Sequence, residues 1–438
     1  MVKFLSVFFA GVITSLYFFP FEFFAFPGLN TKMAMAVVGV FLCLYHLVRK
    51  REFLVPKEFA VLSLVAFAIS LTAYFSVVFN ETPDYVYVSY FISMWVWLSA
   101  AYVVCVVAKK VHRKLTIELL SNYLIAVCVA QCIMAIIIDY TPAVKAVVDT
   151  YINQDQTFLN SVGRLYGIGA WLDVAGTRFS VCLVIIAFML NKYIYDYPPF
   201  KIGIYILAYI IITVLGNMIA RTTTVGNVIS LAYLFVMLKL WRLRIKQDGI
   251  KLFLGIMLLL LLIIPVVWYF YNTNAQFKEL IRYAFEGFFN YFERGAFRTG
   301  STDILKEMYV FPDNFKTWII GDGYYTNPFR IDPYYVSQNY YSLGYYMLTD
   351  VGYLRFIFYF GLIGMLGFVV LIVTITRLLI KKFPGYKHLF LLFMLVNLSI
   401  WLKVSTDIFL VFALFLCIPQ EDNEDYDKLV AIGDEDTV

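Results

Sequence analysis

Apolar runs long enough to cross a membrane recur along almost the whole of this chain. A transmembrane helix needs about 20 consecutive, mostly apolar residues, and runs near that length are separated mainly by short polar connections. This pattern predicts an all-α, polytopic membrane bundle of about twelve transmembrane helices. The candidate spans are 4–20, 32–48, 58–79, 86–108, 115–139, 179–195, 202–220, 223–238, 252–271, 350–376, 387–402 and 407–419.

The composition supports this fold class. Of the 438 residues, 62% are hydrophobic and only 15% are charged, whereas soluble domains average roughly 45–50% apolar and about 25% charged residues. The surplus of apolar side chains must therefore face something other than water. This argues against the two or three soluble domains that the length alone would suggest.

Clusters of lysine and arginine between the spans predict the orientation of the bundle. With about twelve spans, four basic clusters fall on the same side as Lys3 and the C-terminus. Because cytoplasmic connections are enriched in Lys and Arg, both termini are predicted to be cytoplasmic. The clusters lie at 49–51, 109–114, 242–246 and 377–382.

The chain is predicted to contain one large domain and a tail. Residues 1–419 would form the transmembrane domain, and the acidic residues 420–438 a disordered cytoplasmic end. On the outer side, the segment 272–349 is much longer than the other connections. Long loops in compact proteins are usually functional, so this segment is predicted to be a functional, partly helical outer loop.

The long loop contains two candidate helices and a turn. Apolar residues between 277 and 292 recur at helical spacing opposite a charged face, which indicates an amphipathic helix. Such a helix either lies at the membrane interface or covers the bundle, and these two interpretations are compatible. Residues 303–311 are predicted to form a second short helix, and 321–323, with the sequence Gly-Asp-Gly, a turn.

Tyrosines are concentrated in the second half of this loop. Four tyrosine pairs lie between Tyr324 and Tyr346. Tyrosine combines a flat apolar face with a hydroxyl group, which suits contact with sugar rings. The alternative is the aromatic belt that anchors membrane proteins, and the sequence favours neither. The members singled out as candidate sugar contacts are Tyr324, Tyr325, Tyr340 and Tyr341.

Arg221 is the most unusual charge in the apolar region. Nineteen uncharged residues precede it after Lys201, which is about 28 Å of helix, so it is predicted to lie at the outer tip of a helical hairpin. An arginine there either snorkels to lipid headgroups or binds an anion such as phosphate. Five more arginines share the predicted outer side, and each alone is better explained by a structural salt bridge. As a group they suggest an anionic ligand such as a lipid-linked phosphate: Arg164, Arg178, Arg294, Arg298 and Arg330.

Histidine is absent from the predicted outer side, because all three histidines lie at predicted cytoplasmic helix ends. The sequence also contains no P-loop, zinc-ligand spacing or Ser-His-Asp arrangement. Acid–base chemistry on the outer side would therefore fall to carboxylates. The candidates are Glu293, Asp303, Asp322, Asp332 and Asp350.

The order of these features resembles the O-antigen polymerase/ligase superfamily over about 160–419. The resemblance is carried by NMIARTTTVGN around Arg221, by the turn IIGDGYY, and by LTDVGYLRFIFYFGLIG at the start of the next span. The stretch GRLYGIGAWLDVAGTRFS, which contains Arg164, is similar to the family's earlier outer loop. Family ligases characteristically carry a histidine in the long outer loop, and its absence here favours a polymerase.

The resemblance implies a reaction in which an acceptor sugar hydroxyl attacks the anomeric carbon of a glycan held on undecaprenyl diphosphate. No metal, nucleotide sugar or other cofactor is implied, and arginines would neutralise the departing diphosphate. The predicted catalytic residues are Arg221, Arg298 and Arg294, with Asp350 and then Glu293 as the groups that orient or deprotonate the acceptor. The predicted substrate-binding residues are Arg164, Arg330, Arg355 and the four tyrosines named above. For Arg355, a structural pair with Asp350 is slightly favoured.

The resemblance also implies a location and partners. The protein would lie in the bacterial cytoplasmic (inner) membrane, among membrane lipids, and would bind an undecaprenyl-diphosphate-linked oligosaccharide. A chain-length regulator and a flippase are possible protein partners, and nucleic acid is not expected. The alternative functions are an O-antigen ligase, a flippase for lipid-linked oligosaccharides and a non-catalytic assembly subunit; a channel fits least, because no span carries a continuous polar stripe.

Overall fold

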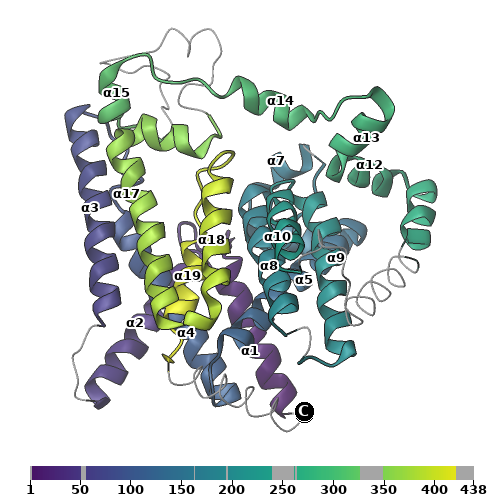
Figure 1. Cartoon of the computed structure of the whole chain (residues 1–438), viewed down its shortest axis with the longest axis horizontal. Helices are drawn as coiled ribbons and strands as arrows, with labels where there is room; N and C mark the ends of the chain where they lie inside the picture. The colour runs from purple at the N-terminus through teal and green to yellow at the C-terminus, as the bar shows by residue number, and fades with distance from the viewer. Residues whose placement is uncertain are drawn as a thin grey trace. The chain divides into compact units, whose positions relative to one another are not determined.

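The computed structural model describes residues 2–50, 56–161, 163–193, 196–238, 261, 264–325 and 349–420. In these residues the only strands are β1 (Glu22–Phe23) and β2 (Ile152–Asn153), which pair antiparallel, and the rest of the regular structure is helical (Figure 1). The α-helices are α1 (Val2–Phe18), α2 (Thr31–Lys50), α3 (Lys57–Phe79), α4 (Tyr90–His112), α5 (Ile117–Tyr140), α6 (Pro142–Tyr151), α7 (Gln156–Ser161), α8 (Leu172–Tyr193), α9 (Pro199–Ile219), α10 (Thr223–Met237), α12 (Ala275–Ala284), α13 (Glu286–Arg294), α14 (Gly300–Glu307), α15 (Phe315–Ile319), α17 (Gly352–Lys382), α18 (Lys387–Ile400) and α19 (Phe409–Leu416).

Seven of the described helices are long and apolar enough to cross a membrane, namely α2, α3, α4, α5, α8, α9 and α17. Three shorter apolar helices, Lys3–Phe18, Thr223–Met237 and Pro384–Ile400, coincide with further predicted spans. The predicted all-α membrane fold is therefore confirmed. The predicted span 252–271 lies largely outside the described residues, and the count of twelve stays a prediction.

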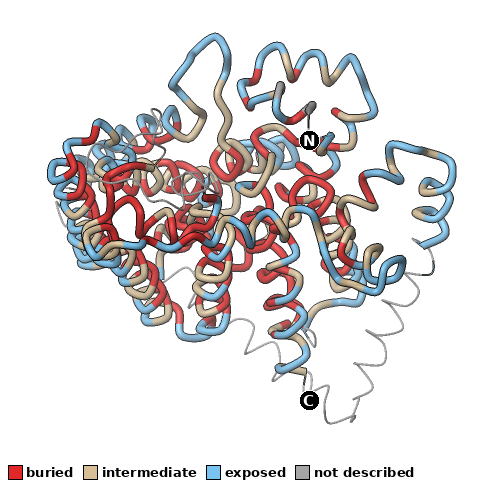
Figure 2. The backbone as a smooth tube through the Cα atoms, turned by 90° about the horizontal axis from the view of Figure 1, so that it is seen from above, coloured by how far each residue is buried: buried red, intermediate tan, exposed pale blue. Residues whose placement is uncertain are grey.

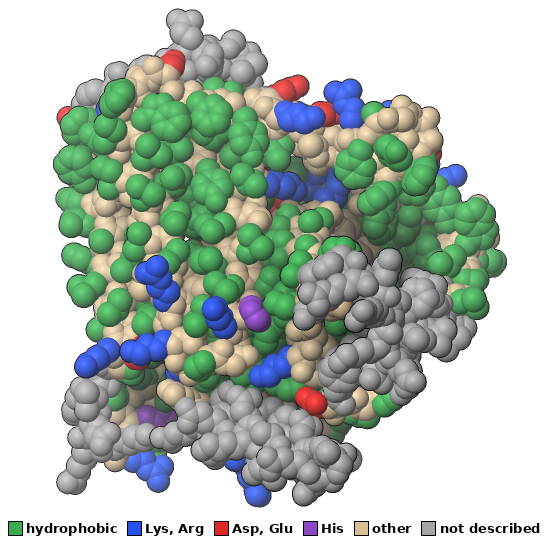
Figure 3. Space-filling model, viewed as in Figure 1, with side chains coloured by type: hydrophobic (Ala, Val, Ile, Leu, Met, Phe, Trp, Pro, Cys, Tyr) green, Lys and Arg blue, Asp and Glu red, His purple; other side chains and the backbone are tan. Residues whose placement is uncertain are grey.

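Many apolar side chains lie on the outside of the helices. Phe41 in α2 is 68% exposed and Leu64 in α3 is 70% exposed. Figure 2 shows buried stretches inside the groups of helices and long exposed stretches at their edges, and Figure 3 shows a face over α3 and α17 on which hydrophobic side chains dominate. Surfaces this apolar are expected where lipid rather than water surrounds the protein.

The chain divides into two compact units. The first unit comprises 1–35, 104–297 and 417–438, and the second comprises 36–103 and 298–416. Both are parts of the predicted domain 1–419; the predicted tail lies, except for Gln420, outside the described residues. In the first unit α8 is the central helix and packs against α5, α9 and α10. Its approach to α10 requires a glycine, because a Cβ on Gly226 would stand 2.3 Å from the Cα of Ser180.

In the second unit the long helix α17 is broken in its first half. Phe360 and Gly361 leave the helical conformation, and Gly361 has a φ of 68°. The break leaves backbone carbonyls without helical partners, and the predicted turn at 321–323 occupies the gap. The N–H of Asp322 donates to the carbonyl of Phe358 at 2.6 Å, and that of Gly323 to the carbonyl of Tyr359 at 3.0 Å. The turn thus restores hydrogen bonds that the broken helix lacks.

The side chain of Asp322 holds this turn in place and is completely buried. Its carboxylate accepts from Lys316 Nζ at 2.6 Å and from Thr317 Oγ1 at 2.7 Å. Asn80, at the end of α3, donates to the carbonyl of Gly321 at 3.1 Å and accepts from Lys316 at 2.7 Å. A buried carboxylate with these partners is a structural group, so Asp322, one of the acid–base candidates, serves the fold.

Candidate functional site

The predicted amphipathic helix of 277–292 is two helices, α12 and α13, which meet at Phe285. Asn274 caps α12 by accepting from the N–H of Phe277 at 2.9 Å. Leu280 and Ile281 are buried, and α12 packs against α9. On α13, in contrast, Phe292 is 82% exposed. The first half of the segment therefore covers the bundle, and the second half has the exposed aromatic surface expected of an interfacial helix.

Arg221 lies in the turn between α9 and α10, as the sequence predicted. The backbone of this turn is bonded to α8. Thr222 donates its hydroxyl to the carboxylate of Asp173 in the first turn of α8, and Ser180 donates to the carbonyl of Thr222 at 2.9 Å. The N–H of Gly226 in turn donates to Ser180 Oγ at 3.1 Å. These bonds hold the backbone that directly follows Arg221 against α8, so its side chain extends from a rigid base.

Two arginines far apart in the sequence meet at one aromatic ring. The guanidinium carbon of Arg221 lies 4.2 Å from the centre of the Tyr283 ring, and that of Arg164 lies 5.0 Å from the same centre. Arg221 also forms an ion pair with the carboxylate of Glu286, at the start of α13. We call these four residues the Tyr283 cluster. All four belong to the first unit.

The Tyr283 cluster is arranged to attract an anion. Its two guanidinium groups and one carboxylate leave one net positive charge. Arg221 is 16% exposed, and within the described part of the chain its buried Nε finds no hydrogen-bond acceptor. A buried donor without an acceptor costs free energy. The planar guanidinium fork matches the oxygen atoms of a phosphate better than a single carboxylate oxygen does, so a phosphate or diphosphate is the ligand chemistry that suits this cluster.

Arg164 is held by a tightly bonded loop that follows α7. The N–H of Ile168 donates to Gln131 Oε1 at 3.0 Å, and the N–H of Gly169 donates to Gln154 Oε1 at 3.1 Å. Tyr166 donates its hydroxyl to Asp149 at 2.8 Å. Burial and then this hydrogen bond raise the pKa of the Tyr166 hydroxyl. The Tyr166 hydroxyl therefore stays protonated and keeps its hydrogen bond to Asp149. This bond helps to fix the loop that carries Arg164.

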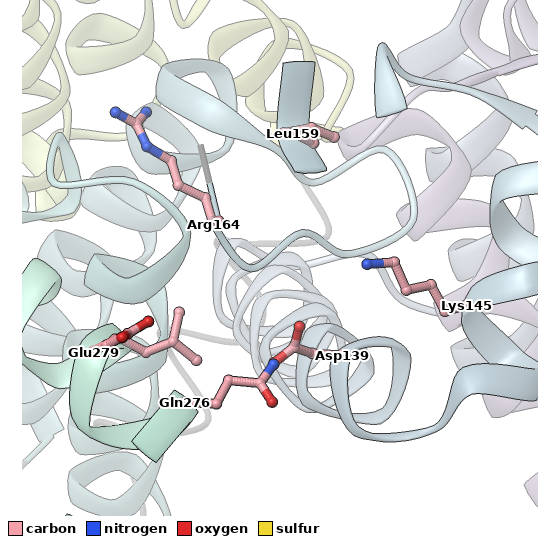
Figure 4. A pocket seen from close by; sticks show the side chains of 8 residues that line it. Asp139, Lys145, Leu159, Arg164, Gln276 and Glu279 are labelled. Carbon is pink, nitrogen blue, oxygen red and sulfur yellow. The ribbon is translucent and has the colours of Figure 1, made fainter. Parts of the chain in front are cut away.

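A cavity of about 210 Å³ opens beside Arg164 (Figure 4). It lies between the end of α5, the start of α6, the α7 loop and α12. Gln276 donates to the carboxylate of Asp139 at 2.7 Å across one side of it. The lining residues are Asp139, Lys145, Leu159, Gly163, Arg164, Gln276, Glu279 and Leu280.

Glu293, predicted as the second choice for a base, is engaged elsewhere. Both of its carboxylate oxygens accept from Arg282, each at 2.8 Å. These hydrogen bonds lower the pKa of the Glu293 carboxyl. A carboxylate with a lowered pKa is a weaker base, so the pair acts as a clasp between α12 and α13.

Arg294 and Arg298 do not share a helix, because α13 ends at Arg294 and is capped by Gly295, which has a φ of 69°. Arg294 is exposed in the last turn of α13 in the first unit. Arg298 belongs to the second unit, is 68% exposed and lies 3.7 Å from Asp303. The following helix starts at Gly300 and ends at Glu307, earlier at both ends than the predicted 303–311.

The second unit contains the other described candidates. Arg355 donates to the carbonyls of Thr349 at 2.6 Å and Tyr325 at 3.2 Å, and its guanidinium carbon lies 4.4 Å from the centre of the Tyr325 ring. Asp350 is exposed, and no ion pair joins these two described residues, Asp350 and Arg355. Arg355 therefore supports the backbone just before α17 by bonding the carbonyls of Thr349 and Tyr325, and not by pairing with Asp350 as predicted.

Tyr324 is 5% exposed and packs in the core of the second unit, with Leu354 and Phe358. Tyr325 donates its backbone N–H to Asp84 at 2.7 Å. Both tyrosines thus contact protein on several sides. Arg330, Tyr340 and Tyr341 lie outside the described residues.

Sequence reasoning missed the residues that complete the site, chiefly Tyr283, Glu286 and Asp139. Tyr283 and Glu286 stand three apart on the predicted amphipathic segment, which indicates a shared face but not the residue that this face meets. No three His, Cys, Asp or Glu side chains cluster to hold a metal within the described ranges. No family model, curated protein or solved structure matches the chain.

Proposed function

We propose that this protein is a membrane-embedded glycosyltransferase that joins oligosaccharide repeat units carried on undecaprenyl diphosphate. It would act as an O-antigen or capsule polymerase at the outer face of the bacterial cytoplasmic membrane. The observation that carries the proposal is the convergence of Arg164 and Arg221 on Tyr283. Their position among long apolar helices suits a substrate that is anionic at one point and lipid-bound beside it.

The reaction needs stabilisation of charge at the leaving group. The acceptor oxygen forms a bond to the anomeric carbon while the bond from that carbon to the diphosphate oxygen breaks. The electron pair leaves with the diphosphate, and the hydroxyl proton passes to a carboxylate or to water. Fixed guanidinium groups stabilise the growing negative charge without reorganising. Arg221 is assigned this role first and Arg164 second, because both are held by bonded backbone segments.

Glu286 is the internal counter-ion of this site. In the absence of a ligand its carboxylate neutralises part of the charge on Arg221. A diphosphate offers more oxygen atoms and more charge than one carboxylate, so it would displace Glu286 on binding. The break at Phe285 between α12 and α13 lets Glu286 move without unfolding α12.

The test is glycan laddering in a strain that lacks this gene. Complementation with the wild-type gene is expected to restore the ladder, and Arg221→Ala to leave a single repeat on the lipid anchor at normal protein level. Arg377→Ala, which removes an exposed arginine late in α17, is the matched control and is expected to restore the ladder. Full-length polymer retained on the lipid carrier would instead identify a ligase, and repeats that never reach the outer face would identify a flippase.

A further inference from the structure

The cavity beside Arg164 is lined by four charged side chains that form few contacts with one another. Two carboxylates, Asp139 and Glu279, and two cations, Lys145 and Arg164, line it. Among these four described side chains there is no ion pair of one with another. The one hydrogen bond between lining side chains is that of Gln276 to Asp139. The cavity therefore retains hydrogen-bond donors and acceptors for a ligand.

The arrangement of the charged side chains favours one class of ligand over another. Figure 4 shows Glu279 on the same side as Arg164, and Asp139 beside Gln276 and facing the side from which Lys145 enters. Acidic and basic groups are thus mixed around the cavity rather than separated. A zwitterionic headgroup would fit a cavity whose acidic side chains lie at one end and whose basic side chains lie at the other. A ring that carries several hydroxyl groups satisfies both kinds of side chain, because each hydroxyl donates to a carboxylate and accepts from a cation.

The size and place of the cavity agree with a single sugar ring. A volume of about 210 Å³ has room for one ring, and the rest of an oligosaccharide would extend out of the cavity. Leu159 and Leu280 add apolar surface, which suits the C–H face of a sugar. Arg164 borders both the cavity and the Tyr283 cluster. A sugar held in this cavity would therefore lie next to Arg164, which also belongs to the cluster that would bind a diphosphate.

We propose that this cavity is a monosaccharide subsite, in which Asp139, Lys145, Gln276 and Glu279 hold one ring of the acceptor oligosaccharide by its hydroxyl groups. The identity of that ring as the acceptor rests on the proposed function, whereas the sugar site itself does not. Asp139 and Gln276 are positioned by their mutual hydrogen bond, and the flanking Lys145 and Glu279 select the hydroxyl pattern.

The subsite is tested by ligand-observed NMR on the purified full-length protein in lipid nanodiscs. The probe is the free repeat-unit oligosaccharide, released from the host polymer and carrying neither lipid nor phosphate. The wild-type protein is expected to bind it. Glu279→Gln and Gln276→Ala, both at exposed positions of α12, are each expected to weaken binding by about fivefold to tenfold. Asp139→Ala is expected to weaken it at least as much.

Two controls separate this inference from the proposed function. Glu307→Gln, an exposed glutamate on α14, is expected to leave sugar binding unchanged. Arg221→Ala is expected to abolish laddering but to leave binding of the free sugar intact. Failure of the wild-type protein to bind the sugar overturns the subsite and leaves the polymerase proposal standing. Sugar binding together with normal laddering in the deletion strain retains the subsite and removes the polymerase.

The competing ligand class has its own measurement. Glycerophosphoethanolamine, the soluble headgroup of a zwitterionic lipid, is titrated against the same protein. Binding of this headgroup, with no binding of the sugar, overturns the proposal in favour of a lipid site. Sugar binding that the headgroup does not displace supports it.

Discussion

Arg164 and Arg221 place their guanidinium groups over the ring of the same tyrosine, at 5.0 Å and 4.2 Å from its centre. The two like charges repel each other, and the electron-rich ring and the Glu286 carboxylate offset this repulsion. The tyrosine ring attracts both cations through its negative face, and the carboxylate offsets one of them. The result is a cationic site in which the two guanidinium groups are already brought together.

The aromatic ring at the centre of this site is expected to matter more than its hydroxyl. Tyr283→Phe keeps the ring and should transfer repeats at nearly the wild-type rate. Tyr283→Leu removes two cation–π contacts of about 0.5–1 kcal/mol each and should lower the rate by about tenfold. The rate is measured with purified protein and lipid-linked repeats. Tyr291→Leu, at an exposed position of α13, is the control; equal rates for Tyr283→Leu and Tyr283→Phe would contradict the assignment.

Removal of the internal counter-ion is expected to strengthen anion binding. Glu286→Gln leaves Arg221 without its carboxylate partner. Because the pair is partly exposed, its loss is worth only about 1 kcal/mol, so affinity for inorganic diphosphate should rise by about fivefold. Calorimetry measures the affinity, and the gain should shrink at high salt. Weaker binding in Glu286→Gln would mean that Glu286 helps to hold the ligand.

The clasp between α12 and α13 is expected to open in acid. Arg282 lowers the pKa of the Glu293 carboxyl below its ordinary value of 4.5. The clasp is therefore fully present above pH 4.5 and is lost as the pH falls through the lowered folded value. The protection of amides across 275–294 against hydrogen exchange, relative to the intrinsic exchange rate at each pH, should fall only in that acidic range. In Glu293→Gln this protection should be low at every pH; a pH profile of protection equal to that of the wild type would contradict the prediction.

The break in α17 is expected to tolerate only glycine. A Cβ on Gly361 would stand 2.0 Å from the carbonyl oxygen of Ile319, and its φ of 68° is strained for other residues. Gly361→Ala should therefore destabilise the protein by about 3 kcal/mol or more, measured as thermal unfolding in detergent. Gly203→Ala, in α9 with nothing within 4 Å of the added methyl group, should be neutral or slightly stabilising. Similar melting temperatures for both variants would show that the turn at 321–323 can shift.

The buried ion pair beneath that break makes a separate prediction. Asp322→Asn leaves the ammonium group of Lys316, which is 25% exposed, without its carboxylate. We expect a loss of about 2–3 kcal/mol, because an uncompensated charge remains partly buried. The double variant Asp322→Asn with Lys316→Met should recover part of this loss. Equal unfolding temperatures for the single and double variants would mean that the hydrogen bonds to Asp322, rather than its charge, hold the turn.

The sequence predicted those features that depend on local patterns. Apolar runs located the helices, and the uncharged residues on both sides of Arg221 placed it at a hairpin turn. Periodicity also found the apolar face of α12, but it carries no information on which helix that face meets. The partnership of Arg221 with Tyr283 and Glu286 is therefore a product of packing between segments about sixty residues apart.

Other differences between the predicted and the observed structure have local causes that the sequence indicates only weakly. α14 begins at the cap formed by Thr299, whose hydroxyl accepts from the N–H of Thr302 at 3.1 Å, and so includes Gly300. The break at Gly361 follows from a positive φ that neither the residue type nor the hydropathy of the span reveals. Glu293 was a candidate base because it is a carboxylate on the predicted outer side, and only three-dimensional contacts show that Arg282 occupies both of its oxygens.

The turn inserted into α17 also sets an order for biogenesis. Asn80 donates to the carbonyl of Gly321, 241 residues later in the chain. The ribosome therefore delivers α3, with Asn80 and Ser76 near its end, long before the backbone groups that these side chains bond. Ser76 donates its hydroxyl to the carbonyl of Tyr359, which is synthesised later still. The bonds that join α3 to these later segments can therefore form only after the first part of α17 has been synthesised.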